Sequence, residues 1–176
     1  MRAMGPGSVS SFLKTALDVV YFALYALLAV GGLVLLASLL LSFRPDIIAQ
    51  SAQFRILREA GLDLGDVVFV LAGGLLYVGG LVAIVTCLRK VFATLTAGDP
   101  FHPDNVSRLR LIGFLLAGME LGRMLFRVIF KMIAPNATDN IAGLNPTTWF
   151  AVLAVFVLAE VFREGARLRR EAELTI

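Results

Sequence analysis

Cysteine and histidine are almost absent from this chain of 176 residues, which contains only Cys87 and His102. A single cysteine cannot form a disulfide framework within one chain, and one residue of each kind is too few for a structural zinc site. The sequence also has no glycine-rich phosphate-binding motif and no pairing of a nucleophile with a general base. It therefore predicts a protein that is not an enzyme and that holds no cofactor or metal ion.

Charge is also scarce, because Asp, Glu, Lys and Arg together make up only 16% of the residues. Hydrophobic residues make up 59%, and the mean hydropathy is +0.85. A typical soluble domain is about 45–50% apolar and about 25% charged. The excess of apolar residues indicates a protein that folds in lipid.

Four long apolar segments follow one another along the chain, at residues 19–41, 67–88, 111–134 and 147–162. The first has about 23 residues, which suits a membrane-spanning helix of about 20 better than a signal-peptide core of about 7–15. Lipid-facing strands need only about 9–11 residues, so the lengths favour helices. We therefore expect an all-α fold: one integral-membrane domain that is a bundle of four transmembrane helices.

Three polar stretches connect or follow these segments. Residues 42–66 form an outer loop whose partial amphipathicity predicts a short helix on the membrane face. Residues 89–110 form a hairpin between the second and third segments, and residues 163–176 form a tail.

Lysine and arginine are distributed unequally between the two sides of this arrangement. One side has ten of them, at Arg2, Lys14, Arg89, Lys90, Arg108, Arg110, Arg163, Arg167, Arg169 and Arg170, and the other has four, at Arg44, Arg55, Arg58 and Lys131. The positive-inside rule then places both termini, the hairpin and the tail in the cytoplasm, and the protein in the inner membrane. The basic residues contact anionic lipid there, and we expect no direct binding to nucleic acid.

The third apolar segment carries three charged residues, Glu120, Arg123 and Arg127. On an ideal helix they share one face, within an arc of about 80° that also includes Lys131. Glu120 and Arg123 are three residues apart and can pair within the helix. Arg127 can extend outward to the membrane surface, pair with Glu120 or meet an acid of the outer loop such as Asp63 or Asp66. Three readings stay open: a salt-bridge network that fixes helix register, a site for an ion, a proton or an anionic ligand, and a polar helix end beyond the lipid.

Glycine pairs recur in the apolar segments, at Gly31-Gly32, Gly73-Gly74 and Gly79-Gly80. Small residues let helix backbones approach closely in membranes, so we interpret these pairs as packing notches. Gly118 and Gly122, four residues apart on the face opposite the charges, predict a further close contact.

Two cytoplasmic stretches resemble one known family. The first is Gly98-Asp99-Pro100-Phe101, followed by Asn105, Arg108-Leu109-Arg110 and Gly113, and the second is Val161-Phe162-Arg163-Glu164-Gly165-Ala166-Arg167-Leu168. Together they resemble DUF2975, a family of small bacterial membrane proteins without an established activity. The resemblance implies a four-helix membrane fold and no catalytic residues. Genes of this family often lie beside one for a very small helix-turn-helix regulator, which implies, by association, a regulator as partner.

We therefore expect a membrane partner or sensor that binds a small cytosolic helix-turn-helix regulator through the hairpin and tail. The candidate docking residues are Asp99, Pro100, Phe101, Asn105, Arg108, Arg163, Gly165 and Arg167. One alternative is that hairpin and tail only pack together and anchor the inner face. Another is a small transporter or channel that uses Glu120, Arg123 and Arg127 and requires a homo-oligomer.

Overall fold

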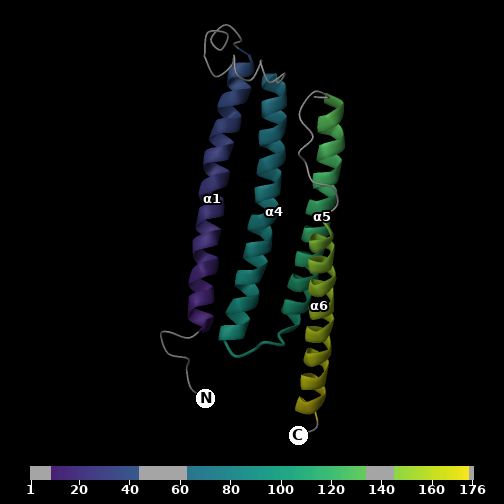
Figure 1. The fold of residues 1–176 in the computed structure, drawn as a ribbon. Coiled ribbons are helices and arrows are strands. Elements are labelled where there is room, and N and C mark those ends of the chain that lie inside the picture. Colours follow the sequence, from purple (N-terminus) through teal and green to yellow (C-terminus); the bar gives the residue numbers. More distant parts are fainter. Residues whose placement is uncertain (1–8, 44–62, 134–144, 175–176) are drawn as a thin grey trace.

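The computed structural model describes residues 9–43, 63–133 and 145–174, which contain helices and turns but no strand. The helices are α1 (Val9–Ser42), α4 (Leu64–Thr96), α5 (Pro103–Ile133) and α6 (Pro146–Glu173) (Figure 1). The all-α prediction is confirmed. Residues 44–62 of the outer loop, where the short amphipathic helix was predicted, lie outside the residues that the structure describes.

Two of the described helices are long and apolar enough to cross a membrane, namely residues Phe12–Ser42 of α1 and the whole of α4. At about 1.5 Å per residue, each is about 45–50 Å long and exceeds the hydrocarbon core of about 30 Å. They indicate a membrane protein whose helix ends extend beyond the lipid tails. In α5 the apolar sequence is interrupted by Glu120, Arg123 and Arg127, and the last third of α6 is highly charged.

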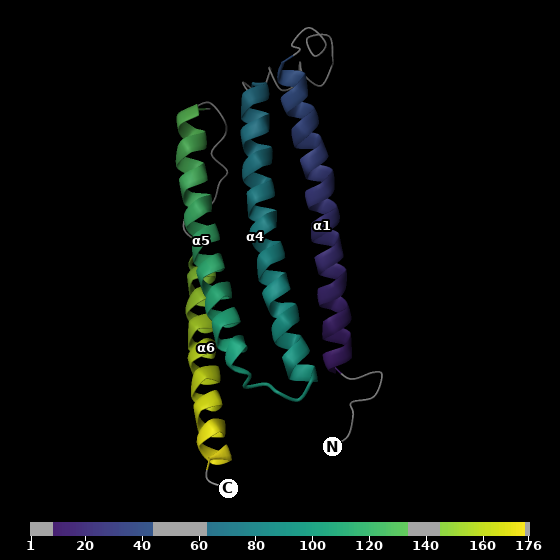
Figure 2. The same ribbon diagram turned by 180° about the vertical axis from the view of Figure 1, so that it is seen from behind.

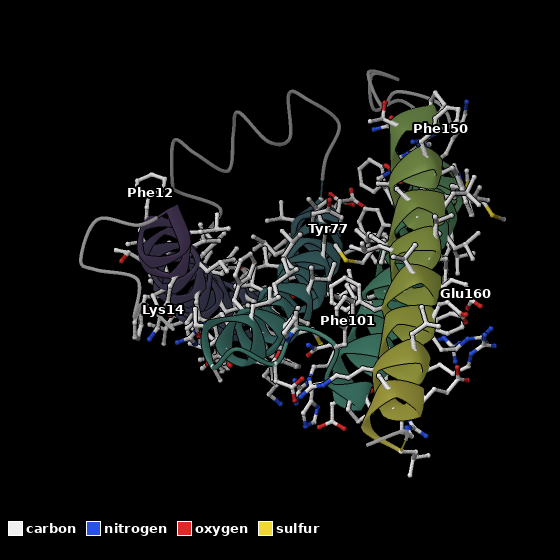
Figure 3. The ribbon with its side chains drawn as sticks, turned by 90° about the horizontal axis from the view of Figure 1, so that it is seen from below. Phe12, Lys14, Tyr77, Phe101, Phe150 and Glu160 are labelled. Atoms are coloured by element: carbon white, nitrogen blue, oxygen red, sulfur yellow. The ribbon has the colours of Figure 1, made fainter. Side chains whose placement is uncertain are left out.

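The helices are arranged in the order of the chain, as an open row. The sequence predicted a bundle of four helices without specifying which of them are in contact. Among the described residues, the extensive contacts join α1 to α4, α4 to α5 and α5 to α6, so each helix packs on its neighbour in the chain. Figures 1 and 2 show α1, α4 and α5 side by side, with α6 overlapping the lower half of α5, and Figure 3 shows the same helices from below. Lipid tails are as apolar as leucine, so hydrophobicity alone does not close such a row. Side chains such as Phe22 and Leu33 of α1 accordingly stay exposed.

Each of the three glycine pairs places one member at a helix contact. The contacts are Gly31 with Leu75, Gly73 with Phe126 and Gly80 with Met119. A Cβ atom added at any of these glycines would come within 2.8 Å of the neighbouring side chain, while the other glycine of each pair (Gly32, Gly74 and Gly79) faces open space. The pattern agrees with their interpretation as packing notches.

Gly118 and Gly122 behave differently from these pairs. Both are exposed, and nothing lies within 4 Å of a Cβ atom added at either position. The close helix contact expected there is therefore not formed within the described residues. The reason is the row: α5 turns other faces toward α4 and α6, so the face with the two glycines points outward.

α6 is shifted along its own axis relative to the other helices. Its first turn lies at about mid-height of α5, and its last turns extend below the ends of α4 and α5 (Figure 1). Contacts agree with this offset, because Asn145 meets Glu120 in the middle of α5 and Arg110 near the start of α5 lies 3.8 Å from Glu160. The C-terminal part of α6 therefore projects past the hairpin.

Gly73→Ala should destabilise the contact between α4 and α5. A Cβ atom there would lie 2.2 Å from Phe126, whose ring is stacked on Phe69 at 4.6 Å and on Phe130 at 6.3 Å between centroids and cannot easily move. We expect a loss of about 1–3 kcal/mol of unfolding free energy, measured by denaturant titration in detergent. Gly74→Ala is the matched control; it faces open space and should be neutral or stabilising. Equal stability of the two variants would contradict the contact.

Candidate functional site

The hairpin between α4 and α5 is a tight turn over residues 97–102. Gly98 has a φ of 83°, in the left-handed region that glycine adopts without a steric penalty. α5 then begins at Pro103, where the missing N–H costs no helical hydrogen bond. His102 precedes it and its Nδ1 accepts a hydrogen bond from the backbone N–H of Asp104 at 3.2 Å. The sequence thus folds this segment as a fixed turn.

Asn105 is the centre of this turn and is fully buried. Its Nδ2 donates to the hydroxyl of Thr94 at 2.7 Å and to the carbonyl of Pro100 at 3.1 Å. Its Oδ1 accepts from Arg108 at 3.1 Å, and Arg108 also donates to the carbonyl of Lys90 at 3.3 Å. These bonds join the end of α4, the turn and the start of α5.

Phe101 connects the turn to α6. Its ring lies against Gly165, where an added Cβ atom would come within 2.4 Å of the ring, and its centroid is 5.8 Å from that of Phe162. Figure 3 places Phe101 between the end of α4 and α6. Asp99 adds an ion pair to Arg169 on the same side of α6. Hairpin and tail therefore pack together.

The candidate docking residues fall into two groups as a result. Six of them contribute to the internal contacts: Asp99, Pro100, Phe101, Asn105, Arg108 and Gly165. Arg163 and Arg167 instead lie on the outer side of α6, with 58% and 63% of their side chains exposed. The sequence interpretation did not include Thr94 and Arg169 among these contacts. Arg169 follows Gly165 by four residues, a helical spacing that could have placed it on the same face.

The outer side of the projecting helix end carries both signs of charge. Arg167 lies 2.7 Å from Glu164 and 3.4 Å from Glu171, and Arg163 pairs with Glu160. We call this the α6 surface; a shallow depression on it is lined by Arg163, Glu164, Arg167, Arg170, Glu171 and Leu174. Leu174, at the end of this charged helix, is an apolar side chain that is 83% exposed.

The charges within α5 form a separate site, because Glu120 is buried, with 5% of its surface exposed. Arg123 holds the Glu120 carboxylate with two nitrogens, with its Nε 3.0 Å from Oε2 and its Nη2 bonded to Oε1. The backbone N–H of Asn145, at the start of α6, points to Oε1 at 3.5 Å. The predicted pairing of Glu120 with Arg123 is therefore present, and the beginning of α6 covers it.

Arg127 lies one helical turn further along α5. Its Nε and Nη2 atoms are buried, and neither has a hydrogen-bond partner among the described residues. At the start of α4, the backbone N–H of Asp63 donates to the carboxylate of Asp66 at 2.8 Å. The described residues contain no cluster of His, Cys, Asp and Glu that could hold a metal ion.

A family model matches residues 17–176, and its description is a protein of unknown function, DUF2975. The chain belongs to the DUF2975 family. The match includes both stretches on which the resemblance depends, the hairpin and the C-terminal part of α6. No curated protein and no solved structure matches this DUF2975 chain.

Asn105→Ala should destabilise this DUF2975 protein by about 1–3 kcal/mol, because it leaves buried polar groups of the turn without partners. Denaturant unfolding in detergent measures the change. Ser107→Ala is the matched control, since Ser107 is exposed and donates only to the carbonyl of Asp104 in its own helix. If both variants unfold like the wild type, Asn105 does not hold the turn.

Proposed function

We propose that this DUF2975 protein is a non-enzymatic inner-membrane protein that binds a small cytosolic helix-turn-helix regulator at the α6 surface. The observation that carries the proposal is the projection of α6 past the hairpin, with Arg163, Arg167 and Leu174 exposed on it. The other face of the same helix end is occupied by Phe101 and Asp99. The hairpin thus holds the helix end in place and leaves its outer side free for a partner.

The proposed topology has four membrane spans with both termini in the cytoplasm. The excess of Lys and Arg on one side supports it. It is further supported by the ion pair, at 2.7 Å, of Asp18 near the start of α1 with Arg89 near the end of α4, because the start of α1 then lies beside the end of α4 that leads into the hairpin. In this topology the α6 surface faces the cytoplasm.

The charge pattern of the α6 surface favours a protein over a nucleic acid as partner. Arg167 is neutralised by Glu164 and Glu171, whereas binding to a phosphate backbone depends on basic residues that displace counterions. A surface of mixed charge with an apolar residue such as Leu174 suits a protein of complementary charge. The choice of a helix-turn-helix regulator as the partner rests on the gene association in the family. The regulator would be held at the membrane by this contact.

Co-purification tests the proposal. The tagged full-length protein is extracted gently from its native membrane, and mass spectrometry identifies what accompanies it. We expect a small helix-turn-helix protein with the wild type, and at least about tenfold less of it with Arg167→Gln/Arg170→Gln, since two charges at the rim of the contact are lost.

Arg169→Gln is the matched control. It removes an arginine from the same turn of α6, but from the face that pairs with Asp99. The regulator should stay bound to this variant. Absence of any helix-turn-helix protein from the wild-type preparation would contradict the proposed function, and full retention by Arg167→Gln/Arg170→Gln would contradict the docking surface.

A further inference from the structure

The guanidinium group of Arg127 has an unusual environment. Its Nε and Nη2 atoms are both shielded from the surroundings, and neither finds an acceptor among the described residues. Buried polar nitrogens nearly always have a partner, and a charged group gains more from one than a neutral group does. The group therefore calls for an acceptor that binds two adjacent N–H groups.

Arg123, one turn earlier on the same face, indicates what that acceptor is. It uses its Nε and Nη2 to bind the two oxygens of the Glu120 carboxylate side by side. In Arg127 the same two nitrogens lack a partner. This edge of a guanidinium presents two parallel N–H groups, a geometry that matches two oxygens of a carboxylate or a phosphate.

The nearby acids do not supply these oxygens. Both oxygens of Glu120 are bound by Arg123. The carboxylate of Asp66 accepts the backbone N–H of Asp63, which is the N-cap residue of α4, as part of a capping box. Along the charged face of α5, one carboxylate therefore accompanies two arginines, and Arg127 carries the unbalanced positive charge.

We propose that Arg127 binds a phosphate-type oxyanion, either the headgroup phosphate of an anionic phospholipid or free inorganic phosphate. The site consists of the Nε and Nη2 edge of Arg127, next to the ion pair of Glu120 with Arg123. It is separate from the α6 surface and independent of the regulator.

The test compares the wild type, Arg127→Met and Lys14→Met as full-length proteins in a neutral maltoside detergent. Thermal unfolding is followed without added anion, with phosphatidylglycerol, with phosphatidylcholine and with inorganic phosphate against chloride. Lys14→Met is the control, because it removes an exposed cation from the start of α1, outside both the Arg127 site and the α6 surface.

Without added anion, Arg127→Met should unfold at a higher temperature than the wild type, because two buried N–H groups of a charged side chain that lack an acceptor are gone. Phosphatidylglycerol should raise the unfolding temperature of the wild type and of Lys14→Met, but not that of Arg127→Met. Native mass spectrometry should find about tenfold less bound phosphatidylglycerol on Arg127→Met. If inorganic phosphate alone reproduces the stabilisation and phosphatidylglycerol adds nothing, the ligand is the free anion.

Two results would overturn the proposal. One is that neither phosphatidylglycerol nor phosphate stabilises the wild type more than Arg127→Met. The other is that Arg127→Met is less stable than the wild type without any anion, since Arg127 would then be satisfied by the protein itself.

Discussion

The ion pair of Glu120 with Arg123 is the constraint on which the arrangement of α5 and α6 depends. In the proposed topology α5 lies in lipid, where a charged face on a helix is costly unless protein covers it. α6 begins opposite Glu120, and the backbone N–H of Asn145 points at its carboxylate. The N-terminus of a helix carries partial positive charge, which suits a carboxylate. The partial positive charge at the start of α6 therefore complements the negative charge of Glu120.

The start of α6 at this level has a consequence at its other end. Because α6 begins at mid-height of α5, its last turns extend past the hairpin. The contact of Phe101 with Gly165 holds α6 against the hairpin, and the ion pair of Asp99 with Arg169 holds the next turn of α6 there. The shift of α6 along its axis thus places its start over the Glu120–Arg123 pair and its end, with the α6 surface, beyond the hairpin. Internal and external roles are divided between the two faces of one helix.

The sequence predicted what depends on local spacing and did not predict what depends on the whole row. Helix positions followed from apolar length, and the Glu120–Arg123 pair from a three-residue spacing. Gly118 and Gly122 have a spacing typical of a helix contact, yet they face outward. A glycine spacing does not say which face a helix turns to its neighbour, because lipid covers an apolar face as well as protein does. The pairing of Asp99 with Arg169, 70 residues apart, depends on the offset of α6, which no local pattern encodes.

The most direct measurement is the thermal unfolding of Glu120→Met beside the double variant Glu120→Met/Arg123→Met in the same detergent. Removing one partner of a buried ion pair leaves an unbalanced charge, whereas replacing both by apolar residues removes the charge altogether. If the pair is covered by α6 as described, the single variant unfolds well below the wild type and the double variant recovers most of the loss. A double variant as unstable as the single variant, or less stable, would contradict the account.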